Sequence, residues 1–364
     1  MRVLFVTRPH LPRIGGAQLT THAAARGLSL RGHEVTVLGE ASDPPAGELP
    51  TVDPGVVPYP VLEHPDPIRE LPDLLRRGEC DVVVVEDRGH MAWIPERIIR
   101  AAGDVPTVMH FQMLGSEDAV AALDPGLDAS VAVSEFIAGV LRRRGAENVA
   151  VIPPAVDGAA LEPPRSRRVA LLVNVALHKG IETVLALARL RPDIPFAVAR
   201  MFHPREREDF PTVAERLAEL PNVALRPPTA DPSELYRDAR VVLMPSLRPE
   251  GFGRVAAEAD ICGIPLIAAR TGGIPEAAGR SALLLRPGAP LAEWERALSA
   301  VWDDAAEYVP RARPAERPEL DPDVVAAAWE RHLADVVARA AVAPPRTSTN
   351  GSGPTPAWTT TLRR

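Results

Sequence analysis

The stretch from residue 241 to residue 276 reads VVLMPSLRPEGFGRVAAEADICGIPLIAARTGGIPE. Its apolar run Val241–Met244 predicts a short buried strand, and a second apolar run, Ile264–Ala268, predicts another. Between them Glu250–Gly253 opens a helix, and Thr271–Gly273 makes the turn after the second strand. A strand, a glycine loop, a helix and a strand in this order predict a βαβ unit, and with it a parallel α/β fold.

The glycine loop of this unit is suited to bind an anion. The start of a helix offers unpaired N–H groups and the positive end of the helix dipole, and both favour a diphosphate. Gly251 and Gly253 carry no Cβ, so a ligand can approach their main chain closely. Glu250 and Glu258 flank the loop, and because carboxylates repel phosphates, hydroxyl groups are their better partners. A ligand that combines phosphates with hydroxyls is a nucleotide sugar.

The same stretch resembles the retaining glycosyltransferases of family 4. The resemblance is carried by Pro245-Ser246, by Glu250 and Glu258 with seven residues between them, by Gly263-Ile264-Pro265, and by Gly272-Gly273-Ile274-Pro275-Glu276. It extends over roughly residues 1–340. It implies the GT-B architecture, in which two Rossmann-like parallel-sheet domains face each other across a cleft.

The composition of the whole chain limits the other possibilities. A length of 364 residues suits two domains of ordinary size. The formal net charge of −7 argues against nucleic acid as a main partner, because that binding depends on neutralising phosphates. No apolar run approaches the length of about 20 residues that a membrane helix needs. Cys80 and Cys262 form neither a disulfide framework nor a zinc spacing, so we expect a cytoplasmic protein, either free or peripheral to the inner membrane face.

Lys179 is the single lysine in a chain whose Lys and Arg together number 41. A chain so poor in lysine must place its last one somewhere, and chance is one explanation. However, Lys179 lies at a predicted strand-to-helix turn, where a compact ammonium suits a crowded phosphate site better than a guanidinium does. We therefore expect Lys179 to contact the diphosphate.

The order of the predicted strands and helices divides the chain into four parts. Residues 1–155 are predicted to form a Rossmann-like domain on the acceptor side, and residues 156–322 a Rossmann-like domain that binds the nucleotide sugar. Residues 323–343 have the apolar spacing of a helix, and the resemblance implies that this helix crosses back to the first domain. Residues 344–364 have almost no core-forming side chains, and we expect them to be disordered.

Two features of the first domain are candidates for the same site. Gly15 and Gly16 lie at a predicted strand-to-helix turn, although a purely structural turn explains two glycines as well. His110 stands at the carboxyl end of a predicted strand, where open α/β sheets place their ligands. The resemblance implies that the glycine pair faces the donor diphosphate and that His110 faces the donor sugar.

The second domain departs from the family pattern at one position. The family usually has an arginine five residues before the lysine, and this chain has Asn174 there. Asn174 can donate a hydrogen bond but carries no charge, so the implied diphosphate clamp lacks one cation. We expect Arg254, in the first turn of the helix after Gly253, to replace that cation in part.

These residues together predict the transfer of a sugar from a nucleoside diphosphate. The resemblance implies that the transfer is retaining and of hexosyltransferase type, with UDP as the expected nucleotide. The predicted catalytic residues are His110, Lys179 and Glu250. The predicted donor-binding residues are Gly15, Gly16, Asn174, Lys179, Glu250, Gly251, Phe252, Gly253, Arg254 and Glu258. In this scheme Glu250 holds hydroxyls of the sugar, Glu258 holds the ribose, and neither a metal nor a cofactor is needed.

The sequence leaves other functions open. A sugar-nucleotide epimerase or a phosphorylase on the same fold would keep the same donor site. A catalytically silent partner subunit is a further alternative, since the clamp lacks its arginine. A nicotinamide oxidoreductase is disfavoured because no G-x-G-x-x-G motif follows the first strand. The acceptor is expected to be a small molecule or a lipid-linked compound.

Overall fold

The structure is a computed structural model of the chain. It describes residues 1–7, 10, 15–40, 57–64, 67–76, 78, 80–87, 102–113, 127–201, 204–229, 231–279, 282–303 and 316–343. The tail predicted to be disordered, residues 344–364, lies outside the described residues.

In the described part of the chain the first sheet has seven strands, all parallel, in the order β3-β2-β1-β4-β5-β6-β7. Its strands are β1 (Arg2–Thr7), β2 (Glu34–Glu40), β3 (Val61–His64), β4 (Val82–Asp87), β5 (Thr107–Phe111), β6 (Ala129–Ala132) and β7 (Val149–Val151). The strand order reverses between β1 and β4, which is the arrangement of a doubly wound sheet. Ligands of such sheets lie outside the carboxyl ends of the strands at this reversal.

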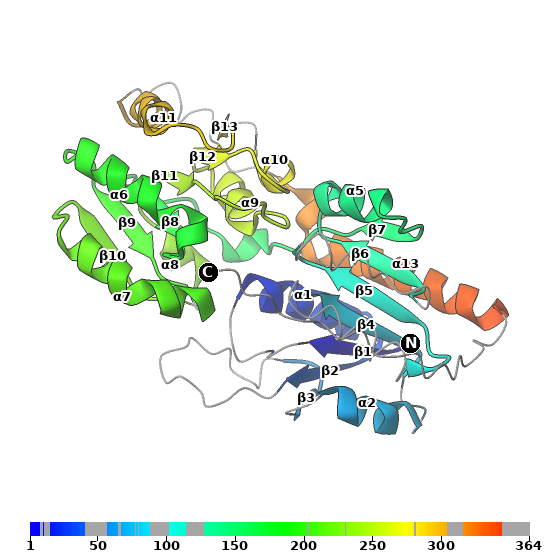
Figure 1. Ribbon diagram of the computed structural model, residues 1–364. Helices are drawn as coiled ribbons and strands as arrows, with labels where there is room; N and C mark the ends of the chain where they lie inside the picture. Colours follow the sequence, from blue (N-terminus) through cyan, green and yellow to red (C-terminus); the bar gives the residue numbers. More distant parts are fainter. Residues whose placement is uncertain are drawn as a thin grey trace, which may run out of the picture.

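Helices cover both faces of this sheet, as its alternating side chains require. The helices are α1 (Gly16–Leu30), α2 (Pro67–Arg76), α5 (Glu135–Arg143) and α13 (Pro322–Val342). Phe5 packs in one apolar cluster with side chains of α1 and α13, and Val6 packs on the opposite face with side chains of α2. In α13, Trp329 lies edge-on against Phe5 with ring centroids 6.0 Å apart. Figure 1 shows α13, coloured orange, along the first sheet.

The second sheet has six strands, also parallel, in the order β10-β9-β8-β11-β12-β13. They are β8 (Val169–Val173), β9 (Phe196–Ala199), β10 (Val223–Arg226), β11 (Ala239–Met244), β12 (Leu266–Ala269) and β13 (Leu283–Leu285). The accompanying α-helices are α6 (Ile181–Leu190), α7 (Pro204–Ala218), α8 (Pro232–Tyr236), α9 (Arg254–Ile261), α10 (Ile274–Ala277) and α11 (Leu291–Asp303). Short 3₁₀ turns cover Gly158–Ala160 (η2), Leu177–Lys179 (η3) and Pro318–Leu320 (η4).

The predicted βαβ unit is therefore β11, α9 and β12. The helix begins at Arg254, because Gly253 before it has φ 102°, a left-handed conformation that cannot belong to the helix. Glu250 consequently lies in the loop, and Glu258 lies within the helix. The prediction of two parallel α/β domains is confirmed.

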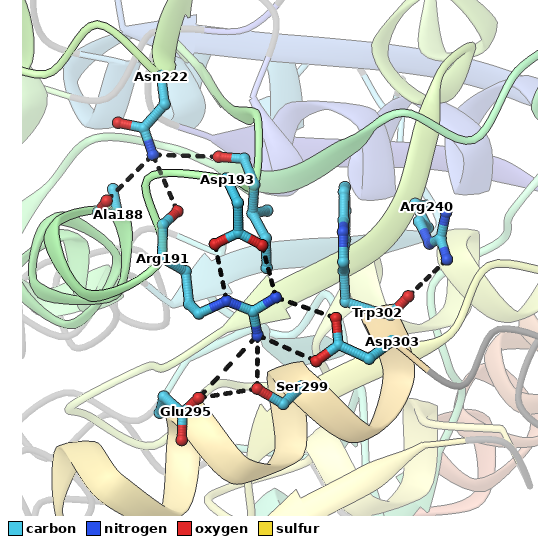
Figure 2. Close-up of polar contacts among 10 residues, drawn as sticks. Ala188, Arg191, Asp193, Asn222, Arg240, Glu295, Ser299, Trp302 and Asp303 are labelled. Atoms are coloured by element: carbon cyan, nitrogen blue, oxygen red, sulfur yellow. Dashed lines mark hydrogen bonds and ion pairs between the residues drawn. The ribbon is translucent and has the colours of Figure 1, made fainter.

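A polar network joins α6 to α11 on one face of the second sheet (Figure 2). The Asn222 side-chain amide donates to the carbonyls of Ala188, Arg191 and Ile194, and so satisfies the carbonyl end of α6. The Arg191 guanidinium binds Asp303 at 3.0 Å. These contacts tie the end of α6 to the last turn of α11.

No helix within the described ranges is both long enough and apolar enough to cross a membrane.

Candidate functional site

A lysine and a glutamate meet between the carboxyl ends of β8 and β11. Lys179 ends the short turn η3 after β8, and its ammonium donates to both carboxylate oxygens of Glu250, each at 2.7 Å. Ser246, in the loop after β11, donates to Glu250 Oε1 at 2.7 Å. The structure thus brings together two predicted catalytic residues that are 71 positions apart in the chain.

The Glu250 carboxylate is ionised in this environment. Burial by itself would raise the pKa of Glu250, but the Lys179 ammonium and the hydrogen bonds from Lys179 and Ser246 outweigh burial. The net result is a pKa below the usual value of a glutamate. At neutral pH Glu250 is therefore an acceptor of hydrogen bonds, which suits it to hold hydroxyl groups and not to donate a proton.

Close main-chain packing holds the loops of the site in place. Gly180, after Lys179, has φ 83°, and a Cβ on it would collide with the carbonyl of Pro245. Gly272 has φ 59°, and a Cβ there would collide with the main chain of Glu250, with which Gly272 forms an isolated β-bridge. Only glycine combines this backbone conformation with so close a contact.

Glu258 lies inside α9, the helix that follows the glycine loop, and its side chain is almost fully buried. Its Oε1 accepts from Arg254 Nε at 2.7 Å, and its Oε2 accepts from the Tyr236 hydroxyl at 2.7 Å. Arg254 Nη1 also donates to the carbonyl of Ala155 at 2.8 Å. Two N–H groups of Arg254 are therefore engaged within the protein, and its side chain orients Glu258.

Asn174 directly follows β8 at the same edge of the sheet. It has φ 82°, and among the described residues it is the only one other than glycine with a positive φ. Its side-chain oxygen accepts from the N–H of Ala176 at 2.9 Å, which stabilises this turn. Asparagine tolerates the left-handed region better than arginine does, so the turn itself accounts for the residue type.

Gly15 and Gly16 lie at the start of α1, as the sequence predicts. Gly15 is the N-cap residue and Gly16 the first residue of the helix. A Cβ on Gly16 would meet no atom within 4 Å. Among the described residues, nothing fills the space beside the main chain of Gly16.

The structure does not place His110 with these residues. Its ring lies edge-on against Trp329 of α13 with centroids 4.9 Å apart, and neither ring nitrogen has a hydrogen-bond partner among the described residues. Burial lowers the pKa of His110 to about 3. The residue is in β5, where neighbouring side chains point to opposite faces, and it shares the face of Val108, toward α13.

Gln112 is a residue of the first domain that meets the glycine loop, and sequence reasoning did not select it. A Cβ on Gly251 would collide with the carbonyl oxygen of Gln112, so the two main chains are in direct contact. The Gln112 side-chain amide donates to Thr21 of α1 at 3.0 Å, and both side chains are buried. The only available signal in the sequence was its place just after the strand Thr107–Phe111.

In the part of the chain that the structure describes, no three His, Cys, Asp or Glu side chains gather in a group that could hold a metal ion. Among the described residues, the Lys179 ammonium pairs with Glu250 and the Arg254 guanidinium with Glu258.

Two parallel α/β domains, with this site at the carboxyl ends of β8 and β11, define the GT-B architecture. Residues 14–159 match the family model described as Glycosyltransferase Family 4, and residues 178–304 match the one described as Glycosyl transferases group 1. The chain belongs to glycosyltransferase family 4.

A curated relative from Arthrobacter sp. (strain FB24) is described as a D-inositol 3-phosphate glycosyltransferase. It is 30% identical over 352 residues, which cover 80% of this chain and 83% of the relative. Two further relatives with the same description align over 45% and 44% of their own length.

Among solved structures, sucrose-phosphate synthase from Thermosynechococcus elongatus superposes with a TM-score of 0.74 at 16% identity, covering 93% of this chain and 100% of that one. Anabaena HepE in complex with UDP-glucose superposes with a TM-score of 0.69 at 17% identity, covering 93% and 98%. At these identities the superpositions establish the fold.

Proposed function

We propose that this glycosyltransferase moves a hexose from a nucleoside-diphosphate sugar to a hydroxyl acceptor, with retention at the anomeric carbon. The observation that carries the proposal is the pairing of Lys179 with Glu250 beside the glycine loop. It combines a cation for a phosphate with an ionised carboxylate for hydroxyls. UDP is the nucleotide we propose, and the UDP-glucose complex of Anabaena HepE, which shares the fold, supports it.

The roles of the residues follow from their contacts. The Lys179 ammonium, released in part from Glu250, would neutralise the leaving diphosphate, together with the main-chain N–H groups of Gly251 to Gly253. Glu250 would accept hydrogen bonds from sugar hydroxyls. Glu258, held by Arg254 and Tyr236, would accept hydrogen bonds from the ribose hydroxyls.

In this proposal protein groups alone hold the diphosphate. The Lys179 ammonium supplies positive charge, and the neutral Asn174 side chain adds an amide. We assign Arg254 a smaller direct part in binding the diphosphate, because two of its N–H groups already bind Glu258 and Ala155. We therefore propose a reaction that is independent of metals and cofactors.

Binding of UDP tests the central proposal. We expect UDP and a UDP-hexose to raise the melting temperature of the protein, because a ligand that binds only the folded state stabilises it. Lys179→Met should abolish this shift, while Glu182→Gln, which changes a surface glutamate paired with Arg216, should retain it. A wild-type protein stabilised by no nucleoside diphosphate and no nucleotide sugar would refute the proposal.

Transfer to an acceptor is the second test. The description of the Arthrobacter relative makes D-inositol 3-phosphate the first acceptor to assay. UDP release that rises when it is added would support a transferase, and the anomeric configuration of the product would test retention. UDP release without any acceptor, or an isomerised donor, would favour a hydrolytic side reaction or an epimerase.

A catalytically silent partner subunit is the second candidate function. Two observations favour it: the His110 ring packs against Trp329 of α13, and Asn174 supplies no cation. In that case the protein would bind UDP without turnover of any nucleotide sugar, and an active enzyme mixed with it would gain activity.

A further inference from the structure

A side chain of the second domain caps a helix of the first. Glu276, in α10, accepts a hydrogen bond from the main-chain N–H of Glu135 at 2.7 Å and from that of Phe136 at 2.7 Å. Both N–H groups belong to the first turn of α5, where the helix offers them no carbonyl partner. Each carboxylate oxygen of Glu276 takes one of them. Figure 1 shows α10 beside the start of α5.

Ser134 completes this cap and binds the glycine loop as well. Its hydroxyl accepts from the N–H of Ile137 at 3.2 Å and donates to the carbonyl of Gly251 at 2.6 Å. The first turn of α5 is thus satisfied by a serine of its own domain and a carboxylate of the other. A negative charge at this end of a helix is also favoured by the helix dipole.

Apolar contacts close the same junction. Phe111 and Ile137 of the first domain belong to one buried cluster with Phe252 and Ile274 of the second. Glu276 itself is exposed, and its two hydrogen bonds lie on the solvent side of this junction. The buried apolar cluster closes the junction beside them.

The segment that carries Glu276 also holds Glu250. The N–H of Gly273 donates to the carbonyl of Glu250 at 2.9 Å, and Gly272 forms the isolated β-bridge to the same residue. Glu276 follows Gly273 by three positions in the sequence. A shift of this segment would therefore be passed to the main chain of Glu250.

Arg317 anchors the segment within the second domain. Its Nη1 donates to the carbonyl of Ala277 at 2.9 Å and to Asp260 at 3.1 Å, and its Nη2 donates to the carbonyl of Glu276 at 3.3 Å. The main chain of α10 is consequently fixed before its glutamate meets α5. A rigid support of this kind is what positions a side chain well.

We propose that Glu276 is a positioning residue that sets the placement of the first domain over the glycine loop by capping α5. The part of this inference that concerns turnover rests on the proposed function, in which the second domain holds the donor and the first domain faces it. Reacting groups held on two domains need a fixed relative placement, because small displacements lower the rate. Loss of the cap should therefore affect turnover more than nucleotide binding.

The structural part is tested with Glu276→Gln, which keeps the size of the side chain but replaces one acceptor oxygen by a donor. Ser134→Ala is the second variant, and Glu182→Gln is the control that alters a surface carboxylate away from the junction. We expect the amides of residues 135–137 to exchange hydrogen about tenfold faster in Glu276→Gln. We also expect a larger radius of gyration by X-ray scattering, with both quantities unchanged in the control.

The functional part is tested by kinetics with a UDP-hexose. Glu276→Gln should lower kcat about tenfold and leave the Kd for UDP within about twofold of the wild type, because in the proposed function the second domain supplies most of the UDP site. Exchange and scattering like those of the wild type would overturn the proposal, and so would an altered placement with unchanged kcat. If the wild type turned over no nucleotide sugar, the proposed function would fail, while exchange and scattering would still decide the interdomain role of Glu276.

Discussion

The ammonium of Lys179 lies 2.7 Å from each carboxylate oxygen of Glu250. The two side chains are mostly buried, with 23% and 16% of their surfaces exposed. A pair in this setting matters for stability as well as for binding, because removing one partner leaves the other charge with little water around it.

Lys179→Met should lower the free energy of unfolding by about 1–3 kcal/mol, since it leaves Glu250 charged and without its cation. The double variant Lys179→Met/Glu250→Gln should recover most of this loss, because it removes the unpaired charge. Denaturant unfolding at neutral pH measures the free energy of unfolding of both variants. A double variant no more stable than Lys179→Met would contradict the charge explanation.

Gly251→Ala should lower both stability and activity. The new Cβ would collide with the carbonyl oxygen of Gln112, so the loop and the first domain would have to separate. We expect a cost of about 1–3 kcal/mol in the free energy of unfolding. Gly16→Ala is the matched change for stability, because its Cβ would meet no atom within 4 Å, and it should be neutral or stabilising. Equal melting temperatures for Gly251→Ala and the wild type would contradict this packing.

The buried His110 should make the protein less stable in acid. Its pKa is about 3 in the folded protein, below the ordinary value of about 6.5, so between these values only the unfolded chain binds the proton. Stability is therefore lost as the pH falls through 6.5, by about 2 kcal/mol between pH 7 and pH 5 for one such group.

His110→Phe, which keeps a ring against Trp329, should remove that part of the pH dependence. Met109→Leu, a change at the neighbouring residue without a titrating group, should keep the pH dependence of the wild type. Denaturant midpoints at the two pH values compare the three proteins. If the stability of His110→Phe fell with pH as much as that of the wild type, His110 would not be the source of the pH dependence.

Asn222→Ala should destabilise the second domain without changing nucleotide binding. The asparagine amide donates to three carbonyls near the end of α6 (Figure 2), at 3.0, 3.2 and 3.0 Å, and alanine leaves them without this partner. We expect a loss of about 1–3 kcal/mol in the free energy of unfolding. The Kd for UDP, measured by calorimetry, should stay that of the wild type. A loss below about 0.5 kcal/mol would mean that water replaces the amide.

The fold could be predicted because its signals are local. The apolar runs Val241–Met244 and Ile264–Ala268 predict buried strands whatever the rest of the chain does, and the glycines between and after them mark the turns. Lys179 and Glu250 could be assigned to one site because both follow strands of one parallel sheet. Carboxyl ends of parallel strands meet at one edge, so strand order alone brings such residues near each other.

The direction of His110 could not be predicted in the same way. Neighbouring residues of a strand point to opposite faces, so an error of one position reverses the expected side. Trp329, which covers His110, comes from a helix 219 positions later in the chain (329 against 110). No local pattern in β5 predicts that contact.

The sequence by itself determined two parallel α/β units and the residue types of a site for phosphates and hydroxyls, since these depend on periodicity and on short motifs. Only the tertiary structure decided which residues of the two domains meet. It brought Gln112 against Gly251 and Glu276 onto α5, and it turned His110 toward α13. Such contacts join distant segments, and their geometry depends on the packing of whole domains rather than on any single stretch of chain.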